Sequence, residues 1–219
     1  MRNLLNICKM LPILVLVLGS CKTKSPDPQN TPITMSDLAD YYLVAEHKTG
    51  GNKLTIISFA KDGDVVKADI HLQGMLRILE GTLQGSTLSL DFHSNGQSIY
   101  SFELEKNADG SLKLKSYDFI YNGEGNQLSY AVLAKKSDAF SFDNSSFKVN
   151  SERLKFIKDN DAETLWWLGR SYLVYKLANV GFKSNQDELM GAAVPNWRGI
   201  AKPVMLIEQE DKIWIAEKE

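Results

Sequence analysis

Cysteine is scarce in this sequence of 219 residues, and both cysteines, Cys8 and Cys21, lie close to its start. The chain that follows residue 21 contains none. Small secreted domains often use disulfides when the hydrophobic core is too small to stabilise the fold. This chain has no such cross-link available beyond residue 21. A folded domain must therefore depend on burial of apolar side chains, and a composition of 43% hydrophobic and 24% charged residues is that of a globular protein.

The motifs that accompany common enzyme chemistries are also missing. The sequence has no G-x-S-x-G, no H-E-x-x-H and no P-loop. Serines and acidic residues are plentiful, but a catalytic triad is defined by geometry rather than by composition. The sequence therefore names no catalytic residue and no cofactor, and it favours a binding or structural protein over an enzyme.

Basic residues form no run or stripe. The chain has 25 Lys and Arg against 27 Asp and Glu, a net charge of −2. Proteins that bind nucleic acid concentrate Lys and Arg where they meet the phosphates. We therefore expect no nucleic-acid partner.

Residues 1–20 have the composition of an export signal. Arg2 and Lys9 precede an apolar run over residues 11–18, and two small residues follow it. The run is too short for a permanent transmembrane helix, which needs about 20 apolar residues, so we expect the segment to be cleaved. Its removal would change the net charge from −2 to −4, because Arg2 and Lys9 leave with it.

The junction Leu18-Gly19-Ser20-Cys21 resembles the lipobox of bacterial lipoprotein signals. The resemblance implies that the thiol of Cys21 carries diacylglycerol, that the chain is cut just before it, and that the new amino terminus is often acylated too. Two or three acyl chains anchor a protein stably, so membrane lipid would be a partner through Cys21. An ordinary secretory signal with an incidental cysteine is the alternative. Lys22, where an inner-membrane retention signal would have Asp, favours the outer membrane of the cell envelope.

Residues 21–36 are predicted to be the lipidated cysteine and a flexible tether. The segment is polar and contains three prolines and almost no large apolar residue. Such a composition cannot bury enough surface to fold. The tether would hold the domain away from the lipid surface.

Glycine turns recur at an even spacing beyond the tether, and several follow Asn or Asp, which is typical of tight hairpins. The glycines are Gly51, Gly63, Gly74, Gly85, Gly96, Gly110 and Gly123. Between them, apolar and polar residues alternate with a period of two, which predicts half-buried strands. The predicted strands cover residues 41–48, 53–60, 64–73, 75–83, 86–93, 97–106, 111–121 and 127–136.

Eight consecutive strands joined by short hairpins form an up-and-down antiparallel meander, and closure into a barrel removes its two exposed edges. We therefore predict an all-β fold with a barrel-like domain over residues 37–137. A flattened sandwich and an open curved sheet are the alternatives. The number and order of the strands resemble lipocalin-like barrels, although the Gly-x-Trp that usually opens a lipocalin is absent near residues 41–44. A change of phase at Ser116–Tyr117 predicts a β-bulge.

Residues 138–219 are predicted to form a mixed α/β appendage. Asn150 or Ser151 is expected to cap one short helix, and a second helix follows in which three large residues share a face. Helix and strand fit residues 171–177 equally well. The three residues on the shared face are Leu165, Leu168 and Tyr172. At the end of the chain, residues 204–208 and 212–216 are predicted to form a terminal β-hairpin.

All three histidines fall near the ends of predicted strands one, three and five. These strands run parallel to one another, so His47, His71 and His93 would lie at one rim. Strands two apart are separated by about 10 Å, which is too far for a shared tetrahedral metal without rearrangement. A solvated strand surface is the simpler interpretation, and a rim site for a metal or for catalysis is the alternative.

The four tryptophans all lie in the last quarter of the chain. Burial at a seam between the appendage and the barrel is the first interpretation. Adjacent tryptophans cannot both bury on one face of a strand, so one of Trp166 and Trp167 is a candidate for a groove or pocket mouth. Trp166, Trp167 and Trp197 are therefore the predicted ligand-binding residues.

The sequence thus favours a lipid-anchored envelope protein whose β-barrel-like domain binds a hydrophobic small molecule, a glycan or an envelope partner. The alternative is a structural or assembly lipoprotein with a solid core, whose aromatic appendage docks on a partner protein. A hydrolase is a third possibility. A cavity of a few hundred cubic ångströms would distinguish a carrier from a scaffold.

Overall fold

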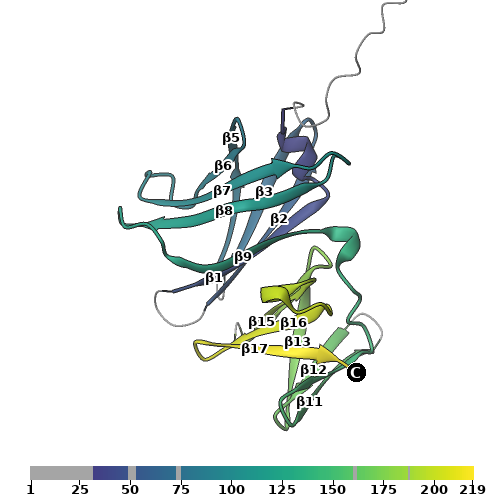
Figure 1. Ribbon diagram of the computed structural model, residues 1–219. Helices are drawn as coiled ribbons and strands as arrows, with labels where there is room; N and C mark the ends of the chain where they lie inside the picture. Colours follow the sequence, from purple (N-terminus) through teal and green to yellow (C-terminus); the bar gives the residue numbers. More distant parts are fainter. Residues whose placement is uncertain (1–31, 49–52, 73–74, 160–161, 187) are drawn as a thin grey trace, which may run out of the picture.

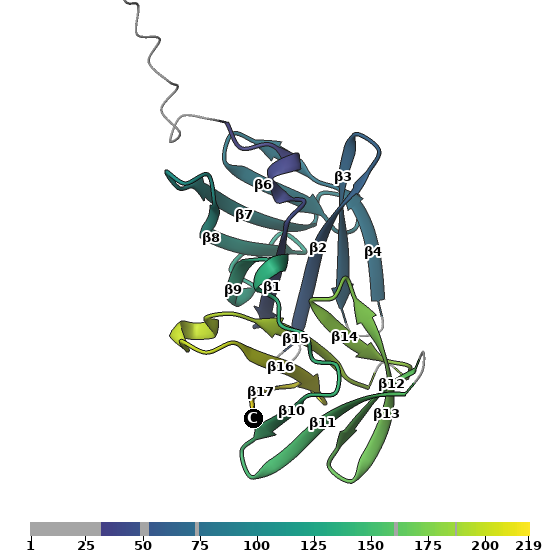
Figure 2. The same ribbon diagram turned by 90° about the vertical axis from the view of Figure 1, so that its right-hand side faces the viewer.

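The computed structural model describes residues 32–48, 53–72, 75–159, 162–186 and 188–219. The predicted leader, Cys21 and most of the predicted tether lie outside these residues. The strand pairings are antiparallel, so the predicted all-β fold is confirmed. Figures 1 and 2 show two modules, one stacked on the other: an N-terminal module (residues 35–135) and a barrel (residues 146–218). Within the described part of the chain, no helix has the length and apolarity to cross a membrane.

The N-terminal module has two antiparallel sheets, preceded by a short 3-10 turn, η2 (Met35–Leu38). One sheet has the order β4-β3-β2-β1-β9 and the other the order β5-β6-β7-β8. The strands are β1 (Tyr41–His47), β2 (Leu54–Asp62), β3 (Val65–Leu72), β4 (Met75–Glu80), β5 (Thr82–Gln84), β6 (Thr87–Asp91), β7 (Ser98–Lys106), β8 (Leu112–Tyr121) and β9 (Leu128–Lys135).

All eight strands predicted for residues 37–137 are present, and the fourth is divided at Gly81 into β4 and β5. A Cβ atom at Gly81 would lie 2.9 Å from Leu90 Cδ2, so glycine lets the chain pass close to the core as it changes sheets. The predicted bulge is confirmed next to its expected place. Ser116 pairs with Glu103 and Leu114 with Leu104, so the residue between Leu114 and Ser116 has no cross-strand partner in the register.

The alternating residues of both sheets meet in one core. Leu43, Ile57 and Ala68 come from the first sheet, and Leu88 and Phe102 from the second, and all are fully buried. The two sheets therefore face each other across a shared interior as in a flattened sandwich, which was the alternative to the barrel predicted for residues 37–137.

The barrel is an eight-stranded antiparallel sheet that closes where β10 pairs with β17. Two 3-10 turns accompany it, η3 (Lys136–Asp138) and η4 (Trp197–Gly199). Its interior is filled by apolar side chains, among them Phe147, Phe156 and Phe182. The strands are β10 (Ser146–Val149), β11 (Glu152–Asp159), β12 (Ala162–Trp167), β13 (Arg170–Leu177), β14 (Gly181–Ser184), β15 (Met190–Val194), β16 (Val204–Gln209) and β17 (Lys212–Lys218).

The closed barrel thus lies in residues 138–219, where a mixed α/β appendage with short helices was predicted, and that prediction of helices is wrong. Leu165 and Tyr172 are direct partners across the β12–β13 hairpin. Leu168 lies between them in the turn, where it is 51% exposed. The spacing of these three residues, three and then four apart, is that of one face of a helix, but here it results from two strands that pair on either side of a turn. The predicted terminal hairpin is confirmed as β16 and β17.

The modules contact each other through apolar sheet faces. The outer face of β1 and β2 packs against β15 and β16, with Tyr42 and Val44 on one side and Ala192 and Leu206 on the other. Tyr42 Oη donates a hydrogen bond to Ala193 O at 2.6 Å. Burial of this cluster fixes the barrel against the sheet that supplies part of the candidate site.

Candidate functional site

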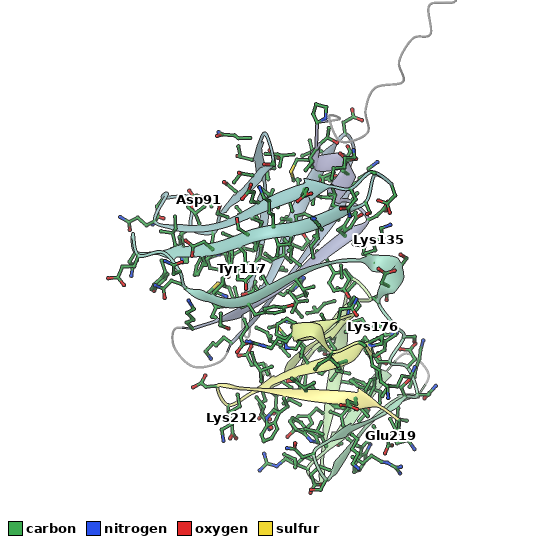
Figure 3. All side chains as sticks on the ribbon, in the orientation of Figure 1. Asp91, Tyr117, Lys135, Lys176, Lys212 and Glu219 are labelled. Carbon is green, nitrogen blue, oxygen red and sulfur yellow. The ribbon has the colours of Figure 1, made fainter. Side chains whose placement is uncertain are left out.

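One end of the N-terminal module is hollowed by a cavity of about 380 Å³. This volume lies within the range of small-molecule sites, about 300–1,000 Å³. Figure 3 marks the same end of the module by Asp91, the last residue of β6. The lining residues come from strand ends that the meander brings together: His47, Lys53, Leu72, Met75, Phe92, His93, Tyr100, Phe119 and Tyr121.

Aromatic rings form the floor of this cavity. Tyr100 and Phe119 are stacked with their centroids 4.2 Å apart. The ring of His47 meets Phe119 edge to face at 5.2 Å, and Phe92 meets Tyr100 in the same way at 6.0 Å. Interlocked rings of this kind hold one another in place and present an apolar surface to a ligand.

A buried polar triad lies within the aromatic floor. His47 Nε2 is 2.6 Å from Thr55 Oγ1 and 3.1 Å from Tyr100 Oη, and the two hydroxyl oxygens are 3.0 Å apart. The three residues are 5%, 0% and 0% exposed. Burial lowers the pKa of His47 to about 4 and raises the pKa of Tyr100. At neutral pH the triad is therefore uncharged, and its hydrogen bonds satisfy polar groups that would otherwise be costly inside an apolar site.

The triad lacks what a nucleophilic site requires. Thr55 is fully buried, so a substrate cannot reach its hydroxyl. Among the described residues that line the cavity, none is a carboxylate that could orient the imidazole of His47. The arrangement is suited to holding a ligand rather than to activating a nucleophile.

Lys53 supplies a cation at the rim of the cavity, and the barrel neutralises it. Lys53 Nζ lies 2.6 Å from Asp211 Oδ1 and 3.7 Å from Glu208 Oε1. The hydrogen bond to Asp211 raises the pKa of Lys53. Glu208 is fully buried, and its Oε2 accepts a hydrogen bond from Leu54 N at 2.8 Å. Two carboxylates thus face one ammonium group, and the rim carries no excess positive charge.

A larger cavity, of about 560 Å³, lies at the opposite end of the module, beside η2 and the start of β1. It is lined mainly by polar residues. Lys106 pairs with Asp37 at 3.3 Å, and Lys136 Nζ donates to the carbonyl oxygens of Ala39 and Phe59. These groups are occupied with one another, so the aromatic cavity is the better candidate for a ligand.

The structure separates the three histidines that the sequence placed at one rim. His47 and His93 line the aromatic cavity. His71 pairs with Ile56, whose side chain packs in the contact between the modules, so it lies on the other face of the sheet. In the described part of the chain, no group of three or more His, Cys, Asp or Glu residues could hold a metal ion.

The three tryptophans predicted to bind a ligand lie in three different surroundings. Trp167 is inside the barrel, edge to face with Trp214 at 5.9 Å. Trp197 is 1% exposed and packs against Tyr130 in the contact between the modules. Trp166 is 49% exposed on the outside of the barrel. They do not form a common site.

Apart from His47 and His93, the sequence did not reveal the residues of this site, among them Thr55, Tyr100 and Phe119. Tyr100 belongs to the predicted apolar face of its strand, which gives no sign of a polar role. Thr55 is the one hydroxyl residue in the apolar run from Leu54 to Ile57, and that is a weak signal. The triad depends on the pairing of β1 with β2 and on the packing of one sheet against the other.

Comparison with known protein families, with curated proteins and with solved structures finds no match to this chain.

Proposed function

We propose that the protein is a lipid-anchored protein of the cell envelope whose N-terminal module binds an uncharged hydrophobic small molecule. The aromatic cavity at the end of that module is the observation that carries this proposal. Its volume of about 380 Å³ is sufficient for a small molecule. Its floor is apolar, and the buried triad of His47, Thr55 and Tyr100 is uncharged and hydrogen-bonded within itself, which suits a ligand with few polar groups.

The charges around the cavity support an uncharged ligand. Lys53 is the ammonium group at the rim, and Asp211 and Glu208 already neutralise it. An anionic ligand would have to approach these two carboxylates without a free cation to balance its charge. A ligand with a positive charge would meet the ammonium group of Lys53, which lines the cavity.

A fluorescence titration tests this proposal. N-phenyl-1-naphthylamine is an uncharged dye that brightens in apolar surroundings, and we expect the mature chain carrying Cys21→Ser to bind it. Met75→Asn should weaken binding about tenfold, which corresponds to about 1.4 kcal/mol, because it places an amide in the cavity wall. Ile78→Asn is the matched control, since Ile78 is on the same strand and 59% exposed but does not line the cavity. Absence of dye binding, or equal effects of both substitutions, would contradict the proposal.

Anchoring through Cys21 is part of the proposal and has its own test. The lipobox-like junction at residues 18–21 supports it, together with the polar segment that precedes the first described element. A Cys21→Ser variant should fold normally yet leave the membrane fraction after cell lysis. A Cys21→Ser variant that still sediments with membranes would contradict the anchor. The outer membrane is the proposed location, because Lys22 follows the cysteine.

The filled interior of the barrel favours a second candidate function for that module. Phe147, Phe156 and Phe182 occupy the space that a ligand would need. A solid barrel fits the role of a structural or assembly module that docks on an envelope protein. If the dye does not bind the N-terminal module, this scaffold function becomes the leading one for the whole protein.

A further inference from the structure

Another cavity lies on the barrel, beside the first half of β13 and the loop between β14 and β15. Its volume is about 580 Å³. In contrast to the aromatic cavity, its lining is mainly polar. The residues that matter are Arg170, Ser171, Leu173, Asn185, Gln186 and Glu188.

The loop that contributes Asn185 and Gln186 is held at its base. Ser184 is fully buried, its N–H donates to Leu189 O at 2.8 Å, and its Oγ accepts from Leu189 N at 3.0 Å. The N–H of Asn185 donates to Leu173 O on β13 at 2.9 Å. These three bonds fix the start of the loop against the barrel before any ligand arrives, which lowers the entropic cost of binding.

The polar side chains of this cavity retain hydrogen-bonding capacity. The side-chain amides of Asn185 and Gln186 have no hydrogen-bond partner among the described residues. The same holds for the guanidinium group of Arg170 within the part of the chain that the structure describes. Each amide offers two donors and one acceptor, and the guanidinium offers five donors. Glu188 takes part in an interaction within the protein.

An exposed aromatic surface borders the cavity. Trp166 is the direct cross-strand partner of Ser171, which lines the cavity, so its indole lies on the same face of the sheet. Trp166 is 49% exposed, and Tyr175, farther along β13, is 52% exposed. The other tryptophan of the pair, Trp167, is buried and stabilises the interior. Because side chains alternate along a strand, the burial of Trp167 places the indole of Trp166 on the outside of the barrel.

We infer that this cavity binds a neutral oligosaccharide. A sugar ring has an apolar C–H face that stacks on an indole, and a rim of hydroxyls that pair with planar amides and guanidinium groups. Trp166 offers the stacking surface, and Asn185, Gln186 and Arg170 offer the hydrogen bonds. A flat lipid surface would use the exposed aromatic rings but not a concave group of amides, so the geometry favours the sugar. This site is separate from the proposed hydrophobic pocket, and neither depends on the other.

Binding is measured on a glycan array of neutral oligosaccharides that includes maltotetraose, cellotetraose and tetra-N-acetylchitotetraose. The sample is the mature chain carrying Cys21→Ser. For any oligosaccharide that binds, calorimetry then compares Trp166→Ala, Asn185→Ala and the control Ile215→Ala. Ile215 is 38% exposed on β17 and does not line the cavity. Circular dichroism verifies the fold of each variant, and Trp166→Phe replaces Trp166→Ala if the latter does not fold.

The expected result is binding of at least one oligosaccharide, weakened at least tenfold by Trp166→Ala and by Asn185→Ala and changed less than twofold by Ile215→Ala. Absence of binding across the array would overturn the inference. So would binding that survives both cavity substitutions. Binding to vesicles of anionic phospholipid that requires Trp166, without any sugar binding, would assign this face to a lipid surface and also overturn it.

Discussion

Glu163 gives a sharp test of the packing inside the barrel. Its side chain is 8% exposed, pairs with Lys176, has Lys158 as its cross-strand partner and lies beside Asp143. Burial raises the pKa of Glu163 from 4.5 to about 7, the hydrogen bond with Asp143 adds to the rise, and Lys176 opposes it. The pKa of Asp143 is lowered, chiefly by its hydrogen bond with Lys176. Asp143 therefore stays ionised, and Glu163 is the member of the pair that takes up a proton.

The raised pKa makes the stability of the folded chain depend on pH. The unfolded chain releases the Glu163 proton near pH 4.5, whereas the folded chain holds it until about pH 7. The stabilisation is complete below pH 4.5 and is lost as the pH rises through 7. These two pKa values give a loss of about 2–3 kcal/mol between pH 5 and pH 8.

Urea unfolding of the wild type and of Glu163→Gln at pH 5 and pH 8 measures this loss. Glutamine has nearly the same shape but does not ionise in this range. Because His47 and His71 titrate in both proteins, the difference between the two proteins isolates Glu163. Relative to the wild type, the variant's free energy of unfolding should rise by about 2–3 kcal/mol from pH 5 to pH 8. A difference that is the same at both pH values would refute the reasoning.

Three further predictions concern stability, and each is checked by chemical denaturation against the wild type. Tyr42→Phe should cost about 1–2 kcal/mol, because Ala193 O loses a buried hydrogen bond between the modules; no loss would mean that water replaces it. Trp197→Ala should cost about 3–5 kcal/mol and separate the unfolding of the two modules, because the indole is buried between them; one unchanged transition would contradict this. Leu168→Gly should stabilise by about 0.5–1 kcal/mol, because Leu168 has φ 52 and is exposed; destabilisation would show that its side chain contributes packing.

The strands of the N-terminal module were predictable because two signals agreed. Residues such as Leu88 and Leu90 alternate with polar neighbours, and glycine marks most of the turns. Gly63, Gly85 and Gly110 have positive φ, so the residue type that the turns require was visible in the sequence. The pairing of the two sheets was not visible, because it depends on the bend at Gly81.

The barrel was not predictable in the same way, because its turns use other residues at positive φ. Ala178 and Asn179 form one such turn and Glu210 and Asp211 another, with φ between 45 and 60. Neither pair has the glycine that identifies a hairpin. The β12–β13 hairpin carries Gly169, but the spacing of its large residues resembles a helical face. The turn signal that located the first module was therefore missing or contradicted in the second.

The candidate site was only partly predictable. Strand direction correctly placed His47 and His93 at one end of the module, since that depends only on the order of strands. The face of the sheet on which a histidine lies depends on the pairing register of its strand. His71 lies on the opposite face of the sheet from His47. The contact of Lys53 with Asp211 joins residues of different modules and has no counterpart in local sequence.

Native mass spectrometry tests the central claim most directly. The mature chain carrying Cys21→Ser is purified without detergent from its own cell envelope, alongside Met75→Asn and Ile78→Asn versions of it. The account predicts a non-covalent small-molecule adduct that organic solvent removes. The adduct should persist in the Ile78→Asn protein and be reduced or absent in the Met75→Asn protein. An adduct of equal abundance in all three proteins, or no adduct together with no dye binding, would contradict a hydrophobic pocket in the N-terminal module.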